Sequence, residues 1–172
     1  MEFAAAGRSM MYNGCQQAVG EPGMIDRLSV TLQSSLAEIP RLSEAIASFA
    51  ARNELSVDAL TAANLVLEEV VTNIIVHGLK GREGETIAVK LALEPEMLVL
   101  TSEDSAPPFN PLLAPEPDLT KPLDERRPGG LGIHLLRRMM DRLEYRRADG
   151  KNQLTMWKRL AQRETPAPTG AD

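Results

Sequence analysis

The apolar residues near the start of the chain change from a strand-like to a helix-like pattern. Residues 26–33 alternate between apolar and polar positions, as in a half-buried strand. The next segment, up to residue 55, has apolar residues three and four positions apart, which is the spacing of one helix face. These positions are Ile39, Leu42, Ile46 and Phe49. A strand followed by a helix is therefore predicted.

A second, longer helix is predicted after Ser56. The Ser56 hydroxyl can cap the N-terminus of this helix, and Gly78 can end it. Between these two residues an apolar stripe recurs at helical spacing, formed by Leu60, Ala63, Leu67, Val70, Val71 and Ile74. We expect this segment to be the central helix of the fold.

The second half of the chain predicts two strand pairs and a third helix. Residues 85–94 and 96–103 flank a turn signal at Pro95 and indicate an antiparallel hairpin. Residues 133–143 have a helical pattern, and residues 143–160 form two strand-like segments on either side of Asp149-Gly150. The order of strands and helices predicts an α+β fold, with helices layered on one face of a mainly antiparallel mixed sheet.

Residues 104–128 interrupt this alternation of strands and helices. They contain seven of the twelve prolines and no apolar periodicity. An irregular segment of this length is usually either functional or disordered. We interpret it as a lid.

Composition predicts one folded domain with flexible ends. A chain of 172 residues that is 43% apolar can build a single core without metals or cross-links. Residues 1–23 and 162–172 are rich in small, polar and proline residues and can bury little surface. The expected domain spans residues 24–161.

Charge and cysteine usage exclude several classes of function. The net charge of −5 argues against direct binding to nucleic acid, since no basic stripe is present. The single cysteine, Cys15, cannot form a disulfide framework, so a cytoplasmic location is expected. No apolar run approaches the roughly 20 residues that span a bilayer, so no membrane association is expected.

Glu69 and Asn73 are the first candidate site residues. They are four positions apart on the central helix and project from neighbouring turns. An Asn oxygen can ligate magnesium, while a Glu can accept a proton or hold a water molecule. The alternative is that both lie on a solvated helix face. The surrounding apolar run, residues 65–76, favours a covered face instead.

Three glycines form the second candidate. Gly129, Gly130 and Gly132 stand at the start of the third helix, where free backbone amides and the helix dipole favour phosphate oxygens. An ordinary turn with close helix packing is an equally simple explanation. Arg126 and Arg127, just before the glycines, add charge suited to a terminal phosphate.

Asp104 is the third candidate. It ends an apolar strand and opens the proline-rich lid. A carboxylate fixed there can accept a hydrogen bond from an exocyclic amine such as that of adenine. Its other role is to start the turn that Pro107 and Pro108 continue.

Together the three candidates resemble a known family. Residues 68–78, EEVVTNIIVHG, resemble the N box of the GHKL ATPases, residues 103–111, EDSAPPFNP, resemble their first glycine box, and residues 128–141, PGGLGIHLLRRMMD, resemble their second. The arrangement is similar to that of the RsbW-type anti-sigma-factor serine/threonine kinases, over roughly residues 26–160. The resemblance implies a Bergerat ATP-binding fold that uses ATP and Mg.

The resemblance also implies a role for each candidate residue. Glu69 would be the general base, Asn73 would ligate Mg, and Asp104 would bind the adenine amine. Backbone amides of the second glycine box would lie near the phosphates, and Arg127 would meet the terminal phosphate. The nucleotide-binding positions implied in this way are Asn73, Asp104, Ala106, Arg127, Gly130, Leu131 and Gly132.

The sequence departs from the family pattern at two places. Ala106 stands where the family has the first-box glycine, so the close approach of the backbone to adenine has to tolerate a methyl group. Pro128 separates Arg127 from the second glycine box, and this weakens the assignment of Arg127 to the terminal phosphate.

The family resemblance implies protein partners as well. Its kinases dimerise, hold a sigma factor inactive, and phosphorylate a STAS-type anti-sigma-factor antagonist. A second hypothesis is an ATP-binding partner-switch module that has lost transfer activity. A sensor histidine kinase domain is disfavoured, because neither His77 nor His134 lies on a separate phosphoacceptor helix.

Overall fold

The described part of the chain is built on one seven-stranded sheet. The structure, a computed structural model, describes residues 10–12, 15–18, 26–115 and 130–161. The strand order across the sheet is β1-β2-β3-β4-β5-β7-β6, and all the described pairings are antiparallel. The strands are β1 (Met10–Tyr12), β2 (Cys15–Ala18), β3 (Arg27–Gln33), β4 (Thr86–Glu94), β5 (Met97–Asp104), β6 (Arg142–Ala148) and β7 (Lys151–Arg159).

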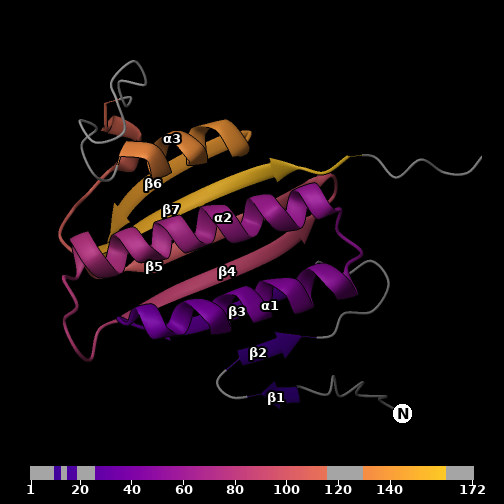
Figure 1. Ribbon diagram of the computed structural model, residues 1–172, viewed down its shortest axis with the longest axis horizontal. Coiled ribbons are helices and arrows are strands. Elements are labelled where there is room, and N and C mark those ends of the chain that lie inside the picture. The colour runs from indigo at the N-terminus through magenta and orange to yellow at the C-terminus, as the bar shows by residue number, and fades with distance from the viewer. Residues whose placement is uncertain (1–9, 13–14, 19–25, 116–129, 162–172) are drawn as a thin grey trace, which may run out of the picture.

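In the described part of the chain, three α-helices cover one face of this sheet (Figure 1). They are α1 (Ile39–Arg52), α2 (Val57–Asn73) and α3 (Gly130–Met139), and α2 lies between the other two. Short 3₁₀ turns, η1 (Leu36–Glu38) and η3 (Pro111–Leu113), precede α1 and follow β5. The predicted α+β fold, with helices on one face of a mainly antiparallel sheet, is confirmed.

The strands β1 and β2 lie within residues 1–23, which composition predicts to be flexible. β2 pairs with β3, so that Cys15 is opposite Val30. The domain boundaries at residues 24 and 161 stay predictions.

The core forms where alternating strand residues meet the helices. On β3, Leu28, Val30 and Leu32 are buried, whereas Arg27 and Thr31 are exposed. The same alternation of buried and more exposed residues continues on β4 and β5. Each fully buried aliphatic side chain contributes roughly 1.5–3 kcal/mol of transfer free energy to folding. The helices add the buried residues Leu42, Ile46, Phe49, Val66, Leu67, Val71 and Leu136.

The central helix begins at its predicted cap. The backbone N–H of Ala59 donates to Ser56 Oγ at 3.2 Å. After Asn73 the helical run widens into one π-helical turn, η2 (Ile74–Gly78), in which Leu79 N–H donates to the Ile74 carbonyl at 2.6 Å. The helical run therefore ends at Gly78 as predicted, but its last turn is wider than an α-helix.

The combined run Val57–Gly78 is also longer and more apolar than expected. It has 22 residues, and an 18-residue window within it has a mean hydropathy of 1.5, enough by length and composition to cross a membrane. The expectation that no apolar run approaches this length is therefore wrong for this segment. Val66, Leu67 and Val71 are fully buried in the core, whereas Leu65 and Val76 are each 42% exposed. A core helix of a soluble fold passes the same test of length and composition, so the run by itself is weak evidence for a membrane span.

Candidate functional site

Glu69 and Asn73 contact each other on α2. Asn73 Nδ2 donates a hydrogen bond to Glu69 Oε1 at 2.9 Å, and both side chains are half-buried. The helix face that carries this pair is thus partly covered. Because the Asn73 amide points its nitrogen at Glu69, its oxygen remains available to another ligand.

Gly132 packs directly against Glu69. A β-carbon at Gly132 would lie 1.8 Å from Glu69 Oε1 and 2.1 Å from Glu69 Cδ, which no side chain could tolerate without movement of the glutamate. The first turn of α3 therefore meets α2 at the carboxylate. Two of the three sequence motifs are in contact.

The third motif meets the end of the same helical run. A β-carbon at Gly78 would lie 3.0 Å from the methyl group of Ala106, and Ala106 is only 3% exposed. The alanine that replaces the family glycine thus places its methyl group against Gly78, where a small residue leaves room for it. The Ala106 methyl group is therefore buried in the interior of the protein.

Asp104 is held in place by two donors. It is 6% exposed, and its Oδ1 accepts hydrogen bonds from Ala106 N–H and Asn152 Nδ2, both at 2.9 Å. The first bond is the turn-starting role that the sequence allowed. The second comes from a different strand and holds the carboxylate on the helix-covered side of the sheet.

Sequence reasoning missed Asn152 and its neighbours. Asn152 is also 6% exposed, and its Oδ1 accepts from Tyr145 Oη at 2.8 Å and from Arg147 Nη1 at 2.6 Å. The available signal was a polar residue at a core position, since Asn152 alternates with the buried Leu154 and Met156 on β7. Buried polar side chains usually have a specific hydrogen-bonding task.

The beginning of the lid is fixed to α3. Arg137 donates to the carbonyls of Leu112 and Ala114, each at 2.9 Å, and Asn110 Oδ1 caps η3 by accepting from Leu112 N–H at 2.9 Å. The remaining lid residues, 116–129, lie outside the described part of the chain. Arg126, Arg127, Pro128 and Gly129 are among them. Gly130 and Leu131 are the first two residues of α3.

The residues fit a magnesium ion shared with a phosphate ligand better than a protein-only metal site. Among residues 10–12, 15–18, 26–115 and 130–161, no group of three or more His, Cys, Asp or Glu side chains could hold a metal ion. Magnesium commonly takes one or two protein oxygens and completes its shell with water and phosphate. The oxygen of Asn73, turned away from Glu69, is suited to such a position.

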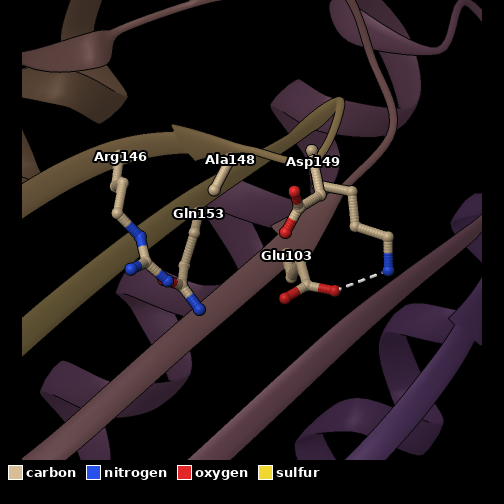
Figure 2. A pocket seen from close by; sticks show the side chains of 6 residues that line it. Glu103, Arg146, Ala148, Asp149 and Gln153 are labelled. Carbon is tan, nitrogen blue, oxygen red and sulfur yellow. Dashed lines mark hydrogen bonds and ion pairs between the residues drawn. The ribbon is translucent and has the colours of Figure 1, made fainter.

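A shallow hollow on the opposite face of the sheet is separate from these residues. It is lined by Glu103, Arg146, Ala148, Asp149, Lys151 and Gln153 (Figure 2). Neighbouring residues of a strand point to opposite faces, so Glu103 faces away from the side occupied by Asp104. Lys151 Nζ lies 2.7 Å from Glu103 Oε1, and this hydrogen bond lowers the pKa of the Glu103 carboxyl. None of the predicted site residues that the structure describes lines this hollow.

Comparison with known proteins agrees with the three contacting motifs. The family described as the histidine kinase-like ATPase domain matches residues 32–158. The serine/threonine-protein kinase BtrW of Bordetella bronchiseptica is 33% identical over 92 residues, which are 54% of this chain and 65% of that protein. Anti-sigma F factors of Bacillus thuringiensis and Bacillus cytotoxicus are each 34% identical over 101 residues, or 58% of this chain and 68% of theirs.

The chain thus spans just under two thirds of the length of BtrW and just over two thirds of the anti-sigma F factors. The family match covers all three motifs, from Glu69 to Gly132, and membership of an ATPase family implies the use of ATP. These relatives also agree with the resemblance to RsbW-type anti-sigma-factor kinases. The chain belongs to the histidine kinase-like ATPase domain family.

Proposed function

We propose that this protein is an ATP-dependent serine/threonine protein kinase that acts as an anti-sigma factor in a partner-switching system. The observation that carries the proposal is the contact of Gly132 with Glu69, which is itself hydrogen-bonded to Asn73. A proton acceptor, a metal-ligating amide and a glycine-rich helix start then meet at one point. The names of the related kinase and anti-sigma factors support the same activity.

The spacing along the helical run suits an extended nucleotide. Glu69 and Gly78 are nine residues apart, which is on the order of 13 Å along a helix. The Gly78 end contacts Ala106, next to Asp104, and the Glu69 end contacts Gly132. We place adenine at Asp104 and the phosphates at the start of α3, so that α2 and η2 form the floor of the site.

Each residue has a separate task in this arrangement. Asp104 accepts a hydrogen bond from the adenine amine, while the backbone amides at Gly130 and Gly132 face the phosphates. The oxygen of Asn73 would hold magnesium, which when bound neutralises phosphate charge. Ala106 and Leu131 contribute backbone to the site, and Arg127 is proposed to meet the terminal phosphate.

The reaction we propose is in-line transfer of the γ-phosphoryl group. The oxygen of a substrate Ser or Thr hydroxyl forms a bond to the γ-phosphorus, the bond from that phosphorus to the leaving ADP oxygen breaks, and Glu69 accepts the hydroxyl proton. Such transfer requires mainly positioning and charge neutralisation. A half-buried carboxylate held by Asn73 provides the positioning.

The proposed substrate is a STAS-type anti-sigma-factor antagonist. The protein would act as a cytoplasmic homodimer that holds a sigma factor inactive and exchanges it for the antagonist. A phosphate adds about −1.5 to −2 charges, and at an interface with a chain of net charge −5 it favours release of the antagonist. No direct contact with nucleic acid is needed for this control.

The competing function is a nucleotide-binding module without transfer activity. Its sequence support was Ala106 in the first glycine box. The burial of the Ala106 methyl group against Gly78 removes that support, because the substitution is compensated inside the protein. The kinase is therefore the better proposal.

The decisive experiment incubates the protein with γ-labelled ATP, magnesium and the STAS-domain protein encoded beside it. The kinase proposal requires label on a Ser or Thr of the STAS protein, and its loss when Glu69→Gln replaces the wild type. The matched control is Glu68→Gln, which removes the adjacent exposed carboxylate and should keep full transfer. Binding of ATP with no label on the partner would favour the module instead.

A further inference from the structure

We propose that Asn152 is a positioning residue, which turns the Asp104 carboxylate so that one oxygen is kept for the amine of adenine. The inference rests on the proposed nucleotide site and adds the determinant of base specificity within it. Asn152 lies opposite Asp104 in the pairing of β5 with β7. Both side chains are on the helix-covered face of the sheet and are 6% exposed.

The orientation of the Asn152 amide follows from the chemistry of its neighbours. Its Oδ1 accepts hydrogen bonds from Arg147 Nη1 at 2.6 Å and Tyr145 Oη at 2.8 Å. A guanidinium can only donate, so the side of the amide that faces Arg147 has to be the oxygen. The nitrogen must then face the opposite way.

The nitrogen of Asn152 faces acceptors only. It lies 2.9 Å from Asp104 Oδ1, 3.1 Å from the Ala106 carbonyl and 3.3 Å from the Pro107 carbonyl. Two N–H groups are thus shared among three oxygens of the strand end and the first turn of the lid. Arg147 Nη1 also donates to the Ala106 carbonyl at 3.0 Å, so the β6–β7 hairpin clamps this turn from one side.

The clamp distinguishes the two oxygens of Asp104. Oδ1 receives both Ala106 N–H and Asn152 Nδ2, whereas no described residue donates to Oδ2. Oδ2 is therefore the oxygen left to accept from a ligand. Without Asn152 the carboxylate keeps only its local bond to Ala106 and can rotate, because a single bond to a residue two positions away does not fix its plane.

The chemical consequence is selection between purines. Adenine presents an N6 amine donor, whereas guanine and hypoxanthine present an O6 acceptor at the same place. A fixed carboxylate oxygen binds the donor and repels the acceptor. A site built around one hydrogen bond discriminates strongly only while its own group stays oriented.

The test compares the affinities for magnesium-ATP and magnesium-ITP, measured by calorimetry on the full chain. Asn152→Leu keeps a similar volume in the strand and removes the amide. We expect the wild type to bind ATP at least tenfold more tightly than ITP. In the variant this ratio of affinities should be about tenfold smaller, because ATP binds more weakly while the affinity for ITP changes little.

Gln153→Leu is the matched control, because it removes the same type of amide from the next residue of the strand. Its side chain lines the hollow on the far face of the sheet (Figure 2) and should leave the preference unchanged. If Asn152→Leu fails to fold, judged by circular dichroism, Asn152→Ala is measured in the same way.

The possible results separate this inference from the proposed function. A wild type that prefers ATP and an Asn152 variant that keeps the full preference would overturn the role of Asn152 alone. Equal weakening of ATP and ITP by the variant would also overturn it, since a general structural effect does not depend on the base. A wild type that binds neither nucleotide would overturn the proposed function, and this inference with it.

Discussion

Gly132 and Glu69 pack so closely that a β-carbon at position 132 cannot be placed while the Glu69 side chain keeps its position. A β-carbon at Gly132 would fall 1.8 Å from Glu69 Oε1, 2.1 Å from Cδ and 2.2 Å from Cγ. The obstacle is the side chain of one glutamate, which is flexible and can move aside. The glycine therefore lets the carboxylate lie at the start of α3, and a larger residue would displace the carboxylate before it disturbed the fold.

We predict that Gly132→Ala slows phosphoryl transfer far more than it weakens nucleotide binding. The added methyl group pushes the Glu69 carboxylate out of place, and loss of a positioned general base lowers the rate on the order of 100-fold. The backbone amide of residue 132 remains, so the Kd for ATP should change much less. Single-turnover transfer and equilibrium binding measure the two effects separately.

The control for this variant is Gly81→Asn. Gly81 has a φ of +66° and open space around the position of a β-carbon, and asparagine tolerates this conformation better than most residues do. Transfer should be unchanged in the control. Full transfer by Gly132→Ala would show that the packing against Glu69 has no part in the reaction.

Local sequence patterns predicted the candidate residues whose position depends on one helix or one strand alone. The four-residue spacing of Glu69 and Asn73 puts them on neighbouring turns of any helix, and their hydrogen bond at 2.9 Å follows from that spacing. Asp104 could be assigned to the end of a strand because apolar alternation stops there. The helix start at Gly130 likewise agrees with the glycine-rich sequence.

Residues that depend on strand register could not be predicted in this way. Asn152 meets Asp104 only because β5 and β7 pair in one particular alignment, across 48 positions of sequence. The fit of Ala106 against Gly78 likewise depends on the π-helical turn at Ile74–Gly78, and no local sequence pattern predicted this turn. In both cases the missing information is a long-range contact.

Separate roles for Glu69 and Asn73 predict different losses on mutation. Glu69→Gln keeps an oxygen that can accept from Asn73 but cannot take up the substrate proton, so transfer should fall roughly 10²- to 10⁴-fold while ATP still binds. Asn73→Ala should abolish magnesium-dependent ATP binding. Titration of ATP with and without magnesium checks both variants, and equal loss of binding and transfer in each would contradict the division of roles.

The pair of Lys151 and Glu103 predicts a small pH-dependent contribution to stability. The hydrogen bond from Lys151 lowers the pKa of Glu103, so the folded state favours the ionised carboxylate. This contribution is present above the ordinary pKa of a glutamate and is lost as the pH falls through the lowered value. The pair is partly exposed, so the effect should be small and should decrease with salt.

Lys151→Met tests this contribution through urea unfolding at several pH values. Its midpoint should lie slightly below that of the wild type at neutral pH, and the difference should disappear as the pH is lowered from about 5 to about 3. Lys158→Met removes the same charge from the same strand and provides the control. A difference that persisted unchanged at the lowest pH would have to come from packing.

The contact between Gly78 and Ala106 predicts that substitutions at the two positions affect stability in a coupled way. Gly78→Ala places a β-carbon 3.0 Å from the Ala106 methyl group, tighter than ordinary contact, and should destabilise the fold by about 1 kcal/mol through overpacking. Ala106→Gly removes a buried methyl group and should also cost about 1 kcal/mol. The double variant restores one methyl group between the two backbones, so its free energy of unfolding in urea should exceed the value expected from adding the two losses. Strict additivity would mean that the two sites are independent and that the methyl group of Ala106 is accommodated elsewhere.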